Sequence, residues 1–136
     1  MTGVESVEQM PIRTGDDVVR VRQLVRTRAR AVQLSLVDQT KLVTAASELA
    51  RNIVTYGGSG MARVETVTKN GRRGIQATFS DSGPGIADVE LALTDGWTSG
   101  TGLGLGLSGA RRLVDEFDID TEVGKGTTIT VVKWIR

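Results

Sequence analysis

The chain has 136 residues, and its 17 Lys and Arg against 16 Asp and Glu leave a formal net charge of +1. It contains no cysteine and no histidine, which excludes disulfide scaffolds, thiolate or imidazole metal sites, and catalysis by Ser-His-Asp or Cys-His. The balanced charge argues against a protein held to nucleic acid by many phosphate contacts. The length fits one domain over residues 1–136 with one core.

The apolar segments are too short to cross a bilayer, and the N-terminal segment MTGVESVEQMP lacks the basic start and apolar core of a signal peptide. The absence of cysteine fits a reducing compartment. We therefore expect a cytoplasmic protein that contacts neither a membrane nor a nucleic acid.

The first half of the chain predicts a strand and two helices. Residues 4–13 alternate loosely and contain Pro11, which favours an edge strand. The segment TGDD at 14–17 supplies cap residues for a helix that reaches about residue 34. Asp38 is the expected N-cap of a second helix, which runs to Tyr56 and is stopped by Gly57-Gly58.

The second half predicts two hairpins separated by a glycine-rich segment. Strands at 61–69 and 75–81 flank NGRRG, whose Asn-Gly is a strong hairpin signal. Residues 82–106 are rich in glycine, with a short helix expected at 87–95, and a further helix is expected at 107–117. Strands at 119–123 and 127–135 complete the order, which favours an antiparallel or mixed sheet with helices packed on it.

Glu48 and Asn52 are polar residues in an otherwise apolar helix. They lie four residues apart and therefore on one face, beside the apolar stripe of Leu42, Ala45, Ala46, Leu49 and Ile53. Such a pair is often only a solvated shoulder or a contact to a loop. It is also suited to holding a divalent cation through the amide oxygen and to activating a hydroxyl with the carboxylate.

The segment DSGPGI at 81–86 follows an expected strand and places Asp81 at its end. Gly83 and Gly85 lack a Cβ, so that a flat ring could approach the backbone, and a carboxylate there could accept a hydrogen bond from an exocyclic amine. Taken alone, the segment is typical of a tight turn.

The segment SGTGLGLGLSG at 99–109 has five glycines directly before an expected helix. Backbone N–H groups at a glycine-rich helix entry bind phosphate well. The alternation predicts leucines anchored in the core and glycines facing a ligand. No strand is expected before the segment, which excludes dinucleotide binding of the Rossmann type, and the P-loop pattern is absent.

Together these segments give a more specific pattern than any one of them alone. A helix with ELARN, then DSGPGI after a strand, then GTGLGLGL before a helix, then GKGTT before a final strand resembles the GHKL ATPase family of gyrase, Hsp90, histidine kinases and MutL. The resemblance covers about residues 38–136. SELARN, DGWTSGTGLGLGLSGARRLVDEF and GKGTTITVVKWIR are more specifically similar to anti-sigma regulatory serine/threonine kinases, the RsbT-type switch kinases of the stressosome.

The resemblance implies an α+β two-layer sandwich of the Bergerat type, with a mixed, mostly antiparallel sheet and helices on one face. It implies that ATP is bound with Mg²⁺ and leaves as ADP. Asn52 would ligate Mg²⁺, Glu48 would act as general base, and Asp81 would bind the adenine amine. The rest of the nucleotide site would be formed by Gly83, Gly85, Gly100, Thr101, Gly102, Leu103, Gly104 and Thr127.

The implied activity is transfer of the ATP γ-phosphate to Ser or Thr of a STAS-domain protein, which is substrate and scaffold. The kinase would then activate a downstream signalling effector such as a phosphatase. Because the chain has no histidine to phosphorylate, transfer to another protein is expected. The alternative is an anti-sigma factor, a nucleotide-dependent binding protein that sequesters a sigma factor or another partner.

Overall fold

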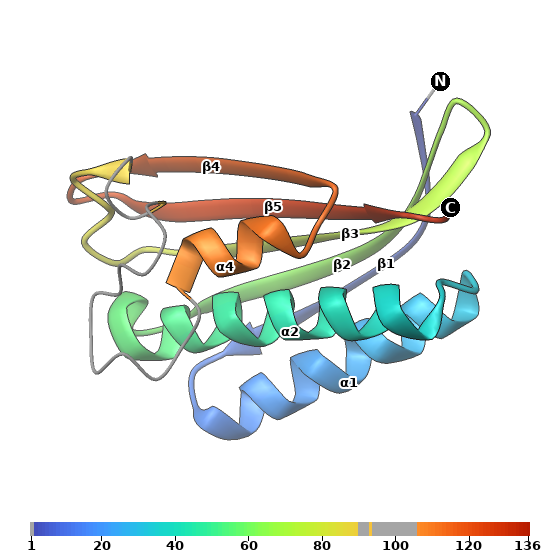
Figure 1. Ribbon diagram of the computed structural model, residues 1–136. Helices are drawn as coiled ribbons and strands as arrows, with labels where there is room; N and C mark the ends of the chain where they lie inside the picture. The colour runs from blue at the N-terminus through green and yellow to red at the C-terminus, as the bar shows by residue number, and fades with distance from the viewer. Residues whose placement is uncertain (1, 90–92, 94–105) are drawn as a thin grey trace.

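The computed structural model describes residues 2–89, 93 and 106–136. Its sheet has the order β1-β2-β3-β5-β4, and all four pairs of neighbouring strands are antiparallel. Three helices lie on one side of this sheet (Figure 1), so the expected α+β sandwich with helices on one face is confirmed. The elements are β1 (Thr2–Ile12), α1 (Gly15–Ala31), α2 (Leu36–Asn52), the π-helical turn η1 (Ile53–Gly57), β2 (Gly60–Lys69), β3 (Arg72–Asp81), α4 (Gly106–Arg112), β4 (Glu116–Glu122) and β5 (Gly126–Trp134).

The core lies between the helices and the sheet, as the helical and strand periodicities predict. The apolar stripe expected on the second helix is buried, with Leu42, Ala45, Ala46, Leu49 and Ile53 each at most 3% exposed. It packs with α1 over alternating residues of the strands. The strand residues buried under the helices include Ile12, Ala62, Val64, Ile75, Ala77, Phe79, Ile129 and Val131.

The far face of the sheet is closed by side chains rather than by a helix in the described part of the chain. Trp134 forms a small buried cluster there with Val67 and Val132. The Arg72 guanidinium lies 5.6 Å from the Trp134 ring centroid, and the indole N–H donates to Glu116 at 2.5 Å. This arrangement explains how an aromatic residue near the end of the last strand is buried on a face that carries no helix.

Several helix boundaries differ from the prediction. α1 ends at Ala31 and not near residue 34, and α2 ends at Asn52, where the π-helical turn η1 takes the place of its expected last turn. The N-cap of α2 is Ser35, whose hydroxyl accepts a hydrogen bond from the N–H of Asp38 at 3.1 Å, so the helix begins at Leu36 and not after Asp38. The helix expected at 107–117 ends at Arg112, and β4 already begins at Glu116. The apolar residues of that segment fit the spacing of a helix and that of a strand. Pairing with β5 makes its last residues a strand.

The hairpin between β2 and β3 is confirmed, with positive φ angles at Asn70 (53°) and Gly71 (78°) as a two-residue turn of type I′ requires. Of the short helix expected at 87–95, the described residues show one hydrogen bond of helical spacing, from Leu93 N–H to the Val89 carbonyl at 3.0 Å. The rest of that segment lies outside the described residues. No helix in the described residues is long and apolar enough to cross a membrane.

A buried ion network joins the beginning of α2 to the end of the sheet. Lys133 is only 3% exposed, and its ammonium lies 3.5 Å from Asp38 and 3.4 Å from Asp115. Asp115 also accepts a hydrogen bond from the N–H of Trp134 at 2.7 Å and is paired with Arg136. Because a buried ammonium needs charged partners, this network fixes the C-terminal strand against α2.

The pKa of Asp115 gives this network a pH dependence. Burial by itself would raise the pKa of the Asp115 carboxyl, but the Trp134 N–H bond and the charges of Lys133 and Arg136 outweigh it, so the pKa lies below its ordinary value of 3.8. A depressed pKa in the folded state means that the carboxylate stabilises the fold above the unfolded pKa, and that this contribution is lost as the pH falls through the folded value.

We expect Asp115→Asn to lower the free energy of unfolding at pH 7 by about 1 to 3 kcal/mol, because Lys133 loses one of its buried counter-charges. The difference between variant and wild type should shrink as the pH falls below the ordinary pKa of 3.8 and through the lower folded-state value, because the wild-type carboxylate then takes up a proton. Urea denaturation between pH 7 and pH 3 measures both quantities. A difference that stays constant over this range would show that the charge of Asp115 contributes nothing.

Candidate functional site

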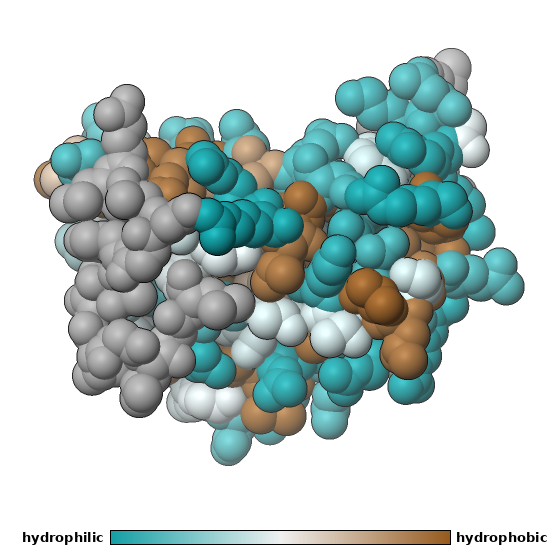
Figure 2. All heavy atoms as spheres, in the orientation of Figure 1, coloured by the Kyte–Doolittle hydropathy of each residue, from teal (hydrophilic) through white to brown (hydrophobic). Residues whose placement is uncertain are grey.

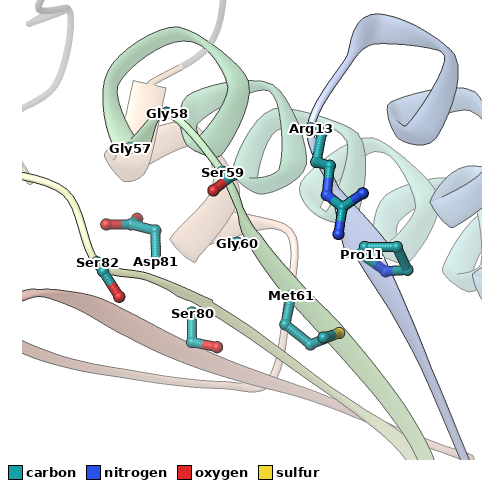
Figure 3. A pocket seen from close by; sticks show the side chains of 10 residues that line it. All are labelled: Pro11, Arg13, Gly57, Gly58, Ser59, Gly60, Met61, Ser80, Asp81 and Ser82. Atoms are coloured by element: carbon teal, nitrogen blue, oxygen red, sulfur yellow. The ribbon is translucent and has the colours of Figure 1, made fainter.

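Asp81 ends β3 and lies among the glycines that the sequence places around it. Its Oδ1 accepts a hydrogen bond from the N–H of Gly83 at 2.9 Å. The half-buried carboxylate extends from the end of β3 toward Gly57 (Figure 3). One oxygen is thus fixed by the following turn, and the carboxylate is oriented by the loop that the sequence predicts as part of the site.

Gly57 allows this arrangement, since its backbone lies directly against the Asp81 side chain. A Cβ on Gly57 would lie 2.7 Å from Cγ of Asp81, and a Cβ on Gly83 would lie 2.8 Å from Cα of Gly57. Real Cβ atoms essentially never come so close to another heavy atom. Asp81, Gly57 and Gly83 therefore form one closely packed wall that tolerates no side chain at either glycine.

Thr127 lies directly opposite Asp81 in the antiparallel pairing of β3 and β5. Its hydroxyl is 2.8 Å from that of Thr121, which accepts a hydrogen bond from the N–H of Ile86 at 2.9 Å. The predicted residues Asp81 and Thr127 are thus brought together by sheet register. Two threonines of the β4–β5 hairpin connect to the loop that follows Asp81.

Gly85 is a glycine because of both its backbone angle and its surroundings. Its φ is +77°, and a Cβ there would overlap the carbonyl oxygen of Glu122. The neighbouring Pro84 carbonyl accepts a hydrogen bond from Gly124 N–H at 2.8 Å. The loop 82–86 therefore packs closely on the turn between β4 and β5, instead of projecting into solvent.

Glu48 is 7% exposed, and both of its carboxylate oxygens have partners. Oε1 accepts a hydrogen bond from Nη1 of Arg51 at 2.9 Å, and Oε2 accepts one from the backbone N–H of Gly106 at 3.2 Å. Gly106 is the first residue of α4, so Glu48 connects the C-terminal part of α2 to an element 58 residues later in the chain. The residue is therefore not a solvated shoulder of the helix.

Asn52 is the last residue of α2, one turn beyond Glu48, and it is half-buried. The chain then continues through the π-helical turn η1, which packs on β2 and β3 and ends at Gly57 beside Asp81. A π-helical turn is rare and often occurs at functional sites. The end of α2, the beginning of α4, the end of β3 and the β4–β5 turn lie at one end of the molecule (Figure 1).

Gly100, Thr101, Gly102, Leu103 and Gly104, which are expected over the phosphates, lie outside the described residues.

In the orientation of Figure 1, the surface of the described helices is mainly hydrophilic, with apolar residues in small separate groups (Figure 2).

A hollow of about 460 Å³ lies on one side of the Asp81 wall. It is lined by Pro11, Arg13, Gly57, Gly58, Ser59, Gly60, Met61, Ser80, Asp81 and Ser82 (Figure 3). Of the predicted site residues it includes Asp81 alone. The hollow therefore borders the predicted site at Asp81 and Gly57 and is distinct from the region around Glu48 and Asn52.

Asn52 offers a single side-chain oxygen as a metal ligand. This fits Mg²⁺ that is bound together with a phosphate substrate, and it does not fit a metal ion whose ligands all come from the protein. Within the described ranges no group of three or more Asp or Glu side chains is placed to hold a metal ion, and the chain has no His or Cys. Mg²⁺ commonly binds through one or two protein oxygens, with substrate phosphates and water completing its octahedron. A single amide oxygen at the end of α2 is consistent with that mode.

Residues 37–135 match the family described as Histidine kinase-, DNA gyrase B-, and HSP90-like ATPase. The chain belongs to this ATPase family. Family membership implies that ATP is used, and it agrees with the resemblance seen in ELARN, DSGPGI, GTGLGLGL and GKGTT.

Two groups of relatives within the family are similar over most of the chain. "Serine/threonine-protein kinase RsbT" of Bacillus subtilis is 43% identical over 125 residues, which are 92% of this chain and 94% of that protein. "Anti-sigma F factor" of a Geobacillus species (strain WCH70) is 30% identical over 105 residues, which are 72% of this chain and 70% of that protein.

Two solved structures share the fold of this ATPase domain. The RsbU and RsbW domains of Rv1364c from Mycobacterium tuberculosis superpose with a TM-score of 0.66 at 21% identity, over 95% of this chain and 32% of that one. The chain thus spans about a third of the length of that protein. The mycobacterial sensor histidine kinase MprB superposes with a TM-score of 0.56 at 20% identity, over 95% and 99% of the two chains.

Sequence reasoning missed several residues of this site. The sequence predicts Gly57 only as a helix stop, whereas its backbone lies against Asp81. Arg51 and Gly106 hold the two oxygens of Glu48, and Thr121 connects Thr127 to the loop. The spacing of Arg51, three residues after Glu48, was a usable signal, whereas the contacts of Gly57, Gly106 and Thr121 depend on tertiary packing.

We expect Gly57→Ala to lower the affinity for ADP by about 10-fold or more, because the new methyl group displaces the Asp81 carboxylate. Titration calorimetry with Mg-ADP measures the loss. Gly15→Ala is the matched control, since nothing lies within 4 Å of a Cβ at Gly15, and it should bind like wild type. Equal affinities in all three proteins would mean that the position of Asp81 has no effect on the nucleotide.

Proposed function

We propose that the protein is an ATP-dependent serine/threonine protein kinase of the RsbT type, which transfers the ATP γ-phosphate to Ser or Thr of a STAS-domain protein. In this partner switch, as in a stressosome, the kinase then activates a downstream effector such as a phosphatase. The observation that carries the proposal is 43% identity to the kinase RsbT over 92% of the chain. The arrangement of Glu48, Asn52 and Asp81 at one end of the fold supports it.

The roles of the site residues form part of the proposal. Asn52 ligates the Mg²⁺ that accompanies the ATP phosphates, and Asp81 accepts a hydrogen bond from the adenine amine. The wall formed by Gly57, Asp81 and Gly83 supports this role, since the Gly57 backbone and the Gly83 N–H hold the Asp81 carboxylate in one orientation. Gly85 and Thr127 shape the same pocket, and residues 100–104 cover the phosphates.

Glu48 accepts the proton of the acceptor hydroxyl. General bases in proteins are most often histidines, and this chain has none. A carboxylate that is 7% exposed, held by Arg51 and placed one helical turn before Asn52 is suited to this task. In phosphoryl transfer, positioning and charge neutralisation supply most of the rate enhancement, so a base held in one place is what the reaction needs.

The second candidate is an anti-sigma factor, because a relative of that name is 30% identical over 72% of the chain. A protein of this kind uses the same fold to sequester a sigma factor. The higher identity and coverage of the kinase relative favour the first candidate.

Incubation of the purified protein with γ-labelled ATP, Mg²⁺ and a purified STAS-domain protein tests the kinase proposal. We expect label on Ser or Thr of the STAS protein. A parallel pull-down compares the STAS protein with a sigma factor as bait. Capture by the sigma factor, with no label on the STAS protein, would replace the kinase assignment with the anti-sigma one.

Asn52→Ala should weaken binding of a Mg²⁺-ATP analogue by about 100-fold, equivalent to about 2.7 kcal/mol, because the metal loses its protein ligand. The variant should unfold at the same temperature as wild type, since Asn52 lies at the end of α2. Calorimetry with and without Mg²⁺ separates the metal contribution. Gln23→Ala, which removes an exposed amide from α1, is the control; an equal loss in both variants, or none in Asn52→Ala, argues against a ligand role.

Glu48→Gln should keep the affinity for ATP and lower the rate of phosphoryl transfer by a factor of at least about 100, within the range of general-base catalysis. Single-turnover assays with saturating ATP measure the rate, and calorimetry measures the affinity. Asp118→Asn makes the same chemical change at an exposed position on β4 and should behave like wild type. Undiminished transfer in Glu48→Gln would assign the proton to another group.

A further inference from the structure

Glu48 is held by two donors of different strength. Its contact with Arg51 is charge-assisted and measures 2.9 Å, whereas its contact with Gly106 comes from a neutral backbone N–H at 3.2 Å. Both bonds are strengthened by the carboxylate charge, but only the bond from the guanidinium joins two ionised groups, and it is the shorter of the two. Oε1 is therefore the firmly held oxygen, and Oε2 is the oxygen whose partner is more easily exchanged.

Gly106 adopts a backbone conformation that few other residues accept. Its φ is +70°, so the N–H that reaches Oε2 belongs to a left-handed residue at the beginning of α4. The contact thus comes from a chain segment far from α2 in the sequence, and it lies on the opposite oxygen from Arg51. The two donors approach the carboxylate from separate elements.

The Arg51 guanidinium contributes little to the stability of the fold. Its side chain is 54% exposed, and a half-exposed ion pair of this kind is worth about 0 to 1 kcal/mol. The same contact has a larger consequence for Glu48, whose side chain has three rotatable bonds and would otherwise sample several orientations. Removal of Arg51 should therefore leave the protein folded and release the carboxylate from its fixed position.

We propose that Arg51 is a positioning residue for phosphoryl transfer, which anchors Oε1 of Glu48 and leaves Oε2 to take the proton of the acceptor hydroxyl. This inference rests on the role proposed above for Glu48. In the step, the acceptor oxygen forms a bond to the γ-phosphorus while its proton moves to Oε2. The bond between the γ-phosphorus and the β–γ bridging oxygen breaks, and its electron pair leaves with ADP.

The contact with Gly106 gives way in this step, because Oε2 exchanges the weaker backbone donor for the acceptor hydroxyl. Arg51 remains on Oε1 throughout. A carboxylate displaced by about 1 Å from its productive position can cost about 100-fold in rate. The expected effect of losing the anchor therefore lies on the rate of transfer and not on the binding of ATP.

A double-mutant cycle on Glu48 and Arg51 tests the proposal, with the STAS-domain substrate of the labelling assay and saturating ATP. Arg51→Gln should lower the single-turnover rate by about 10- to 100-fold with an unchanged affinity for the ATP analogue. Arg51→Lys, which keeps a charged donor, should recover part of the rate. The variant with both Glu48→Gln and Arg51→Gln should be no slower than Glu48→Gln alone, because Arg51 acts through Glu48.

Arg20→Gln is a closely matched control. Arg20 pairs with Asp17 at 2.7 Å with the same three-residue spacing on a helix, and its side chain is 63% exposed against 11% for its partner. Loss of this pair should leave the rate unchanged. If Arg51→Gln transfers phosphate as fast as wild type, or if the two losses multiply in the double variant, Arg51 does not position Glu48.

These outcomes separate the inference from the proposed function. A normal rate in Glu48→Gln would overturn the role of Glu48 and the inference with it. A slow Glu48→Gln beside a normal Arg51→Gln would overturn the inference alone.

Discussion

The close approach of the Asp81 carboxylate to the Gly57 backbone is the constraint on which the arrangement of the site depends. It joins the end of the central strand β3 to the turn that leaves α2. A methyl group at Gly57 would meet Cγ of Asp81 at 2.7 Å. The turn after α2 and the end of β3 can therefore approach each other only because residue 57 is a glycine. The same approach fixes the end of α2, with Asn52 on it, relative to the sheet.

The pairing of β3 with β5 positions further residues of the site relative to Asp81. Antiparallel pairing places Thr127 opposite Asp81, and the Thr127–Thr121 hydroxyl pair then holds the loop after Asp81 on the β4–β5 hairpin. Glu48 lies one turn before Asn52 on α2 and holds the beginning of α4 through Gly106. Segments far apart in the chain thus meet at one end of the sandwich, where polar contacts join them in addition to the shared apolar core.

The order of the elements could be predicted from local signals, whereas the roles predicted for Glu48, Asn52 and Asp81 stay predictions that their position at one end of the fold supports. Asn70-Gly71 marks its hairpin because both residues adopt positive φ, and the apolar stripe from Leu42 to Ile53 marks its helix because a helix buries one face. The beginning of α2 was misplaced because Ser35 and Asp38 are both good cap residues, and only the observed bond from Asp38 N–H to the Ser35 hydroxyl decides between them. The partners of Glu48 could not be predicted together, since Gly106 reaches it across 58 residues of chain.

The two ends of α2 carry buried charges with different surroundings. At its beginning Asp38 joins a buried network with Lys133 and Asp115, in which a fully buried ammonium has two carboxylate partners. At its other half Glu48 is equally buried, but one of its two partners is a half-exposed arginine and the other is a neutral N–H. A buried charge with one half-exposed ionic partner and one neutral donor is expected to stabilise the fold little, which agrees with the catalytic role proposed for Glu48. The network of Asp38, Lys133 and Asp115 fixes the beginning of α2 to the sheet, so Glu48 does not have to supply this stability.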